Sequence, residues 1–386
     1  MYKIAFVTGS RADYGIVRSY LSMLHADKDI DFSLLLTGAA LDNKYGNLKD
    51  IISSDQFRID YTAPLPLETN SIANTIHAMA VALELFGKYF EASRYDLLII
   101  LGDRYEIFSV AIAAAMHGIR ILHLHGGEIT YANYDEFMRH SITKMSWYHI
   151  TSTEIYRKRV IQLGELPTHV ICGGALGAEN CLTIDINHVP RDLQSLVGQD
   201  YFVILFHPET LNTISPHSQI KELLNGLKCL PVSIRYVFIG SNADTGSDEI
   251  EMEIKRFCEA HKNCIRYQNL HPDAYHFLVK NSLALVGNSS SGIIEAPSLG
   301  VRTVNIGLRQ EGRVYGNSVI NVPCDRTAVY NALKEAIENR KHYDPSDNPY
   351  YRKNSCQIYY EFTKKILSQN TSHFAKIFYD IEFDER

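Results

Sequence analysis

The stretch Leu285–Gly300, with the sequence LVGNSSSGIIEAPSLG, decides the fold. It predicts the end of an apolar strand, a tight turn rich in serine and glycine, and one or two helical turns from Ile293 to Leu299. Free backbone N–H groups at a helix start attract anions, and small side chains let a phosphate approach them. Glu295, one turn into the helix, is placed to accept hydrogen bonds from a sugar diol. The same stretch also fits an ordinary serine-capped helix, and locally both interpretations stay open.

Apolar runs of strand length alternate with helical periodicity on both sides of this stretch. The predicted strands are Lys3–Val7, Phe32–Leu36, Leu97–Leu101, Arg120–Leu124, Tyr148–Thr151, Phe202–Phe206, Arg235–Ile239, Cys264–Tyr267, Leu283–Val286 and Thr303–Ile306. The predicted helices are Tyr14–Leu24, Asn70–Ala92, Tyr105–His117, Asp135–Trp147, Thr153–Leu163, Ser218–Cys229, Asp248–Ala260, Ala274–Asn281 and Ile293–Leu299. Such alternation predicts an α/β fold with parallel sheets covered by helices on both faces.

The length of 386 residues exceeds that of one typical core. We therefore expect two Rossmann-like, doubly wound domains facing a cleft. Residues 1–180 form the first, on the sugar and catalytic side, and 181–350 form the second, on the nucleotide side, with the linker near Gly173-Gly174 and 182–199. Residues 351–386 carry a last helix, Ser355–Leu367, that packs back on the first domain. Ligands of open α/β sheets bind beyond the carboxyl ends of the strands, so the chemistry is expected in the loops that follow strands.

Composition excludes several classes of protein. The net charge of −6, without a long basic run, argues against nucleic-acid binding. No apolar run approaches the roughly 20 residues that span a bilayer, and the N-terminus lacks the features of a signal peptide. Seven scattered cysteines without a Cys-x-x-Cys pair indicate reduced thiols and a cytoplasmic protein. No His-x-x-x-His motif or dense aspartate cluster is present, so we expect neither a metal nor a cofactor.

The loops of the first half carry titratable and cationic groups. Arg11 stands at a helix entrance suited to phosphate oxygens, and Asp103, beside Arg104, is a helix cap or a site carboxylate. The loop His125-Gly-Gly-Glu128 combines two titratable groups with glycines that let backbone approach a ligand.

The segment after this loop begins a helix. Asp135 and Arg139 lie four residues apart and can pair, with His140 beside them. The alternative is an ordinary solvated helix face.

The loops of the second half suit a nucleotide. His207 follows a strand, with Pro208 fixing the exit, and Asn242 lies in the small polar loop Gly240–Asp244. His271 precedes a helix and is either a ligand or a plain loop residue. Arg309, after the last predicted strand, supplies a cation close in sequence to Ser289, Ser290 and Ser291. This division indicates a reacting sugar on one side and a nucleotide on the other.

Eight motifs in one order, over nearly the whole chain, resemble the UDP-N-acetylglucosamine 2-epimerase family, in particular the hydrolysing enzymes of bacterial sialic acid synthesis. They are Val7–Gly15, Gly102–Glu106, His125–Glu128, Asn133–Ser146, Phe206–Thr210, Gly240–Gly246, Gly287–Glu295 and Gly307–Gln310. The resemblance implies the two-domain, GT-B-like architecture that many glycosyltransferases also use. It implies a homodimer or a higher homo-oligomer.

The implied reaction converts UDP-N-acetylglucosamine and water to N-acetylmannosamine and UDP, for sialic acid in capsule or surface polysaccharide. A base removes the C2 proton as UDP leaves C1, giving 2-acetamidoglucal; water then adds at C1 and a proton returns to the other face of C2. By resemblance, Asp103 and Asp135 carry the acid/base steps, with Glu128 and His207 in support. The residues implied to bind UDP or substrate are Arg11, Arg104, Arg139, Asn242, His271, Ser289, Ser290, Ser291, Glu295 and Arg309.

One position departs from related enzymes. His125 stands where the non-hydrolysing and the animal bifunctional enzymes usually have glutamate, so either His125 or Glu128 fills that role. The alternatives are a hydrolysing 2-epimerase for a UDP-2,4-diacetamido-6-deoxy sugar, as in legionaminic acid pathways, a non-hydrolysing 2-epimerase, a GT-B glycosyltransferase, and a non-catalytic nucleotide-sugar sensor.

Overall fold

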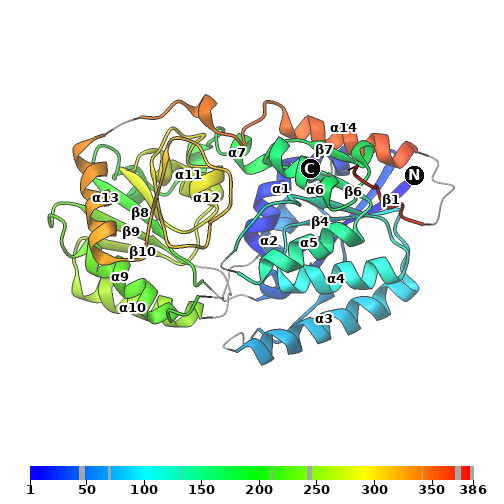
Figure 1. The fold of residues 1–386 in the computed structure, drawn as a ribbon, viewed down its shortest axis with the longest axis horizontal. Helices are drawn as coiled ribbons and strands as arrows, with labels where there is room; N and C mark the ends of the chain where they lie inside the picture. The colour runs from blue at the N-terminus through cyan, green and yellow to red at the C-terminus, as the bar shows by residue number, and fades with distance from the viewer. Residues whose placement is uncertain are drawn as a thin grey trace. The chain divides into compact units, whose positions relative to one another are not determined.

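The computed structural model describes residues 1–42, 48–67, 71–131, 133–209, 212–240, 246–340, 342–369 and 375–382. The chain forms two compact units (Figure 1). The first unit comprises Met1–Glu128, Asp135–Leu176 and Arg352–Arg386, and the second comprises Ile129–Tyr134 and Gly177–Tyr351. No helix in the described ranges is long and apolar enough to cross a membrane.

The first unit is built on a seven-stranded parallel sheet with the order β3-β2-β1-β4-β5-β6-β7. Its strands are β1 (Tyr2–Thr8), β2 (Ile30–Thr37), β3 (Ile59–Ala63), β4 (Leu97–Leu101), β5 (Ile121–Leu124), β6 (Tyr148–Thr151) and β7 (Val170–Cys172). Its helices are α1 (Arg11–Ala26), α2 (Leu48–Ser54), α3 (Ile72–Ala92), α4 (Tyr105–Met116), α5 (Asp135–Met145), α6 (Glu154–Gln162) and α14 (Ser355–Ser368).

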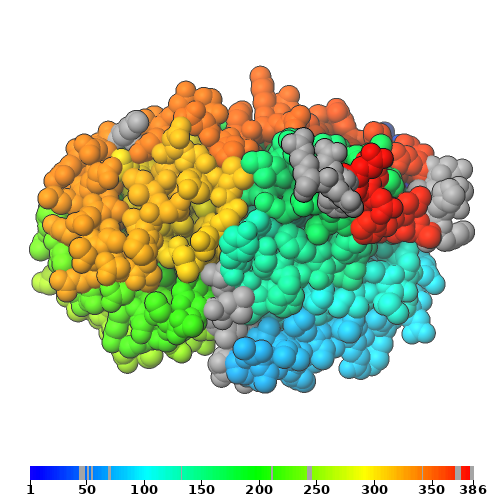
Figure 2. Space-filling model, in the orientation of Figure 1, coloured from blue at the N-terminus to red at the C-terminus, as the bar shows by residue number. Residues whose placement is uncertain are grey.

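Alternate side chains of these strands enter two apolar layers. Ile4 and Phe6 of β1 face the layer formed with α1 and α14, whereas Ala5 and Val7 face the layer formed with α3 and α4. Figure 1 shows α3 and α4 side by side along one side of this unit. The last described segment, 375–382, lies on the surface of the first unit (red in Figure 2), where the backbone N–H of Tyr379 donates to Gly164 O at 2.9 Å.

The second unit is built on a six-stranded parallel sheet with the order β10-β9-β8-β11-β12-β13. Its strands are β8 (Tyr201–Leu205), β9 (Arg235–Ile239), β10 (Cys264–Tyr267), β11 (Ala284–Gly287), β12 (Thr303–Ile306) and β13 (Val319–Val322). Its helices are α8 (Arg191–Gln194), α9 (Pro216–Leu227), α10 (Ser247–Ala260), α11 (Pro272–Lys280), α12 (Ser291–Ile294) and α13 (Arg326–Glu338), and α7 (Leu176–Asn180) lies at the boundary between the units.

Two apolar layers cover this sheet as well. One contains α9, α10 and α13, and the other contains α11 together with Val189, Leu193 and Leu196 from the segment 182–199. Both sheets are parallel and covered by helices on both faces, as the sequence predicts for an α/β fold.

The structure adds elements that the sequence pattern did not indicate and shortens one that it did. β3, β7, β13, α2, α7, α8 and α13 were not predicted. The helix expected over Ile293–Leu299 is wrong in its bounds, because α12 ends at Ile294 and turns follow it. Pro297 lacks an N–H group and cannot continue a helical hydrogen-bond ladder.

Candidate functional site

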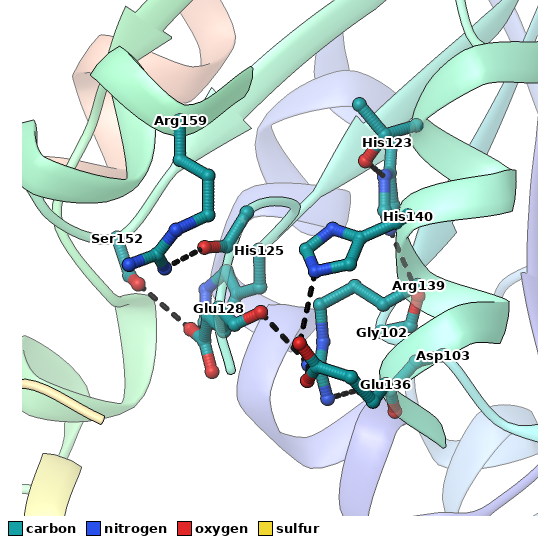
Figure 3. Close-up of polar contacts among 12 residues, drawn as sticks. Gly102, Asp103, His123, His125, Glu128, Glu136, Arg139, His140, Ser152 and Arg159 are labelled. Carbon is teal, nitrogen blue, oxygen red and sulfur yellow. Dashed lines mark hydrogen bonds and ion pairs between the residues drawn. The ribbon is translucent and has the colours of Figure 1, made fainter. Parts of the chain in front are cut away.

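A buried arginine organises the candidate site of the first unit (Figure 3). Arg139 of α5 is 1% exposed and forms an ion pair with Asp103, which follows β4. Its Nη1 donates to Glu136 Oε2 at 3.1 Å and to the backbone oxygen of Glu128 at 2.9 Å. The alternative of a solvated helix face is therefore wrong for Arg139. One guanidinium joins the loops after β4 and β5, while Asp135 is the first residue of the same helix.

The turn His125–Glu128 is held in a shape that glycine permits. A Cβ on Gly127, at φ +79°, would lie 2.6 Å from Tyr156 O. His125 itself has φ +64°, a left-handed conformation that costs a non-glycine residue about 1–3 kcal/mol and that clusters at functional sites. The turn buries the Glu128 carboxylate, which accepts a hydrogen bond from Ser152 Oγ at 2.7 Å and lies 3.7 Å from His125 Nδ1. His125 and Glu128 therefore lie next to each other, with their polar atoms close enough to interact.

The two predicted phosphate-binding arginines of the first unit stand at helix starts. Arg11 begins α1, and burial lowers the pKa of its guanidinium. Arg104 precedes α4 and donates from Nε to Glu106 Oε1 at 2.6 Å. Glu106 is fully buried, and a Cβ on Gly9 would lie 2.3 Å from its Oε1, so the carboxylate fits there only against a glycine.

Asp13 is a titratable group of α1 to which no role was assigned from the sequence. Its amide donates to the N-cap Ser10 Oγ at 3.1 Å. Burial raises the pKa of the Asp13 carboxyl to about 6, against the opposing effect of Arg104, and Asp103 adds to the rise. Among the described residues, no group donates to its buried Oδ2. A carboxyl with a raised pKa beside Asp103 and Arg104 is a further candidate for proton transfer.

A second group that sequence reasoning missed lies beneath the Asp103 loop. His123 of β5 is buried, with Nε2 2.9 Å from Gly102 O and Nδ1 3.2 Å from Thr143 Oγ1. Burial lowers its pKa to about 3, helped by the neighbouring His149, so the ring is neutral at physiological pH. A neutral imidazole hydrogen-bonded to the residue before Asp103 supports the loop without adding charge.

In the second unit, Asn288 ties three loops together. Its side chain accepts from the His207 N–H at 2.7 Å and donates to the His207 carbonyl at 2.8 Å. Its own carbonyl accepts from Arg309 Nη1 at 3.1 Å and from Gln310 Nε2 at 2.7 Å. The loops after β8, β11 and β12 are thus held together by one fully buried side chain and its carbonyl.

Glu209 fixes the loop that carries Arg309. Its buried Oε1 accepts from the backbone N–H groups of Leu308 at 2.7 Å and Arg309 at 3.1 Å. A Cβ on Gly307, at φ +83°, would lie 2.2 Å from this oxygen. Asn288 and Glu209 belong to the motifs Gly287–Glu295 and Phe206–Thr210, but no role was predicted for either residue. Their partners are 81 and 99 residues away, and the sequence gives no signal of that pairing.

The serine-rich turn Gly287–Gly292 (the serine turn) does not cap α12 in the ordinary way. Ser290 is the N-cap of α12, yet its side chain makes no capping hydrogen bond. Among the described residues, the backbone N–H groups of Ser289 and Ser290 donate to no acceptor. These two groups have the character of an anion cradle.

Glu295 is held as a carboxylate beside this turn. Ser291 Oγ donates to its Oε2, and His276 Nε2 lies 3.5 Å from the same oxygen. Burial opposes the ionisation of Glu295. The pKa of Glu295 is nevertheless lowered, because His276 provides a hydrogen bond and positive charge and Ser291 provides a second hydrogen bond. Tyr275 of α11 contacts the Ser291 hydroxyl at 2.7 Å. Glu295 is therefore an ionised acceptor.

Two more residues, His271 and Asn242, were predicted to bind UDP or substrate. His271 is the N-cap of α11, where its Nδ1 accepts from the Asp273 amide at 3.3 Å. Asn242 lies outside the described residues.

Comparison with known proteins first defines the fold and then the family. The structure of the UDP-GlcNAc 2-epimerase from Neisseria meningitidis bound to UDP-GlcNAc matches with a TM-score of 0.78 at 17% identity, over 94% of this chain and all of that one. The profile of the UDP-N-acetylglucosamine 2-epimerase family matches residues 22–362. The chain belongs to the UDP-N-acetylglucosamine 2-epimerase family.

Two relatives are similar to this chain over most of its length. The polysialic acid biosynthesis protein P7 of Escherichia coli is 47% identical over 99% of this chain and 98% of its own length. The hydrolysing UDP-N,N'-diacetylbacillosamine 2-epimerase of Legionella pneumophila is 34% identical over 88% of this chain and 90% of its own.

Proposed function

We propose that the chain hydrolyses and epimerises UDP-N-acetylglucosamine, giving N-acetylmannosamine and UDP for sialic acid synthesis. The observation that carries the proposal is the Arg139 guanidinium, which joins the Asp103 loop to the Glu128 loop. Inversion at C2 through an elimination and a hydration needs acid/base groups for two faces of the sugar. Asp103, Glu128 and Asp135 supply them, with His125 beside Glu128.

The second unit holds the leaving group in this proposal. UDP leaves as an anion and needs cations and N–H donors. The amides of Ser289 and Ser290 and the guanidinium of Arg309 provide both, and Glu295 accepts hydrogen bonds from the ribose hydroxyls. Arg11 and Arg104 assist with the phosphates, and His207 supports the sugar.

The relatives favour N-acetylglucosamine over the diacetamido substrate. Identity to the polysialic acid biosynthesis protein is 47%, against 34% to the hydrolysing enzyme named for diacetylbacillosamine. The second substrate remains the alternative, since both relatives span most of the chain.

Product analysis in heavy water tests the proposal. The wild-type protein with UDP-N-acetylglucosamine should release UDP and N-acetylmannosamine with deuterium at C2. Asp103→Asn should lose turnover at least a hundredfold while still binding UDP, and Glu84→Gln, an exposed carboxylate of α3, serves as the matched control. UDP-N-acetylmannosamine without free sugar would identify a non-hydrolysing epimerase, and product without deuterium would identify a transferase. Faster turnover of the diacetamido substrate would reassign the sugar.

A further inference from the structure

Three potential metal ligands converge in the second unit, whereas the residues given acid/base roles belong to the first. His188 ends the short 3-10 helix η4 (Ile186–His188), and His271 and Asp273 begin α11. His188 Nδ1 lies 2.7 Å from Asp273 Oδ2, and His271 Nδ1 lies 3.3 Å from the same oxygen. One ligand atom from each residue lies within 4.8 Å of the other two.

A tetrahedral cation would match the longer of these two contacts and would widen the shorter one. Zinc–nitrogen and zinc–oxygen bonds of 2.0–2.2 Å separate neighbouring ligand atoms by about 3.3 Å in a tetrahedron. Asp185 Oδ2 lies 3.8 Å from His188 Nδ1, but within the described residues the ligand atoms that all lie within 4.8 Å of one another belong to His188, His271 and Asp273. Two imidazoles and one carboxylate are a donor set that zinc accepts, with water in the fourth position.

Helix capping alone does not account for this cluster. The same His271 Nδ1 lies 3.3 Å from both the backbone nitrogen and the Oδ2 of Asp273, so the ring faces the carboxylate as well as the helix start. The His188 ring approaches the same carboxylate, with its centroid 4.1 Å from that of His271. A cation among these atoms would replace two hydrogen bonds, the His188–Asp273 bond at 2.7 Å and the capping bond of His271 at 3.3 Å, with coordination bonds.

We propose that His188, His271 and Asp273 form a binding site for a divalent cation of the zinc class. The cation joins the segment 185–188 to the start of α11. It plays no part in proton transfer. It steadies α11, whose Tyr275 and His276 contact Ser291 and Glu295. The proposal assigns His271 to the metal rather than to the nucleotide, and it holds whatever sugar the enzyme uses.

Zinc titration of the full, metal-stripped chain under reducing conditions tests the site. Wild-type protein should bind one equivalent saturably at micromolar or lower concentration, with a rise in Tm, in competition with a chromophoric chelator. His188→Ala and Asp273→Asn should each weaken this binding at least tenfold. His217→Ala removes another exposed histidine beside a carboxylate, Glu253, and should leave the binding unchanged.

Circular dichroism of each variant confirms that it folds before its titration is interpreted. The site is overturned if the wild-type chain binds no zinc saturably below 100-fold molar excess. It is equally overturned if either His188→Ala or Asp273→Asn binds as tightly as wild type, or if His217→Ala weakens binding to the same degree.

Discussion

Gly287 closes β11 immediately before the serine turn, and replacing it with alanine tests whether close backbone contact shapes that turn. Its φ of +137° is strained for a residue with a Cβ, and an added Cβ would lie 2.0 Å from Leu205 O on the neighbouring strand β8. The backbone conformation costs about 1–3 kcal/mol. Relief of the contact by moving the strands costs a further 1–3 kcal/mol or so, because both atoms belong to well-packed elements.

Gly198→Ala is the matched control, since Gly198 has φ +81° in the same unit and no atom within 4 Å of an added Cβ. It should lose only about 1 kcal/mol, against roughly 2–6 kcal/mol for Gly287→Ala. Urea unfolding followed by far-UV circular dichroism measures both losses. Fluorescence of Trp147, the single tryptophan, follows the first unit separately.

Gly287→Ala should also weaken the binding of UDP. Asn288 follows Gly287, so displacement of the strand end should disturb its bonds to His207 and weaken UDP binding at least tenfold in Gly287→Ala. Gly198→Ala should bind UDP normally. Equal stability losses in the two variants would show that the contact with Leu205 does not constrain the turn, and the reasoning would fail.

Three further outcomes are expected. Asp13→Asn should stabilise the first unit by about 1–3 kcal/mol at pH 8, because the buried Asp13 carboxyl, with a pKa of about 6, is ionised at that pH and its charge is unfavourable in the folded state. The same substitution should remove the limb near pH 6 from the kcat/KM profile. An unchanged profile would deny Asp13 a role in catalysis. His123 has a pKa of about 3 in the folded protein, against about 6.5 in the unfolded chain, so it lowers the free energy of unfolding as the pH falls from 6.5 toward 3 and has no effect above pH 6.5. Wild type should therefore lose about 2 kcal/mol between pH 6.5 and 5, and His123→Gln should flatten this slope in urea unfolding followed by Trp147 fluorescence. An equal slope in the two proteins would contradict the assignment. Asn288→Ala removes two hydrogen bonds between its side chain and buried backbone groups of His207, and it should cost about 2–4 kcal/mol of stability and at least tenfold in UDP affinity, measured by calorimetry. Normal affinity would show that the loops keep their places without it.

Much of the fold could be predicted because buried parallel strands are continuous apolar runs. Leu97–Leu101 is an example, and its bounds match β4. β3 was missed because Ile59–Ala63 is an edge strand in which most residues are partly exposed, so it lacks an apolar run. α13 was missed although Asp325 caps it through two backbone N–H groups, a local signal that was available.

The candidate site was predictable only as a set of loops. Their order after strands indicated where Asp103 and Arg309 belong. The partners of these residues depend on contacts between distant parts of the chain: Arg139 reaches Asp103 across 36 residues and Arg309 reaches Glu209 across 100. Asp13 shows the same limit, since its raised pKa depends on burial that the local sequence does not reveal.

The return of α14 to the first unit sets an order for folding during synthesis. Tyr359 and Phe362 complete the apolar layer that faces Ile4 and Phe6, yet the ribosome makes them after the whole second unit. The second unit can therefore finish folding while the first still exposes one face of its sheet. A nascent chain halted before α14 should be a target for chaperones that bind apolar surface, and the last helix completes the domain that was begun first.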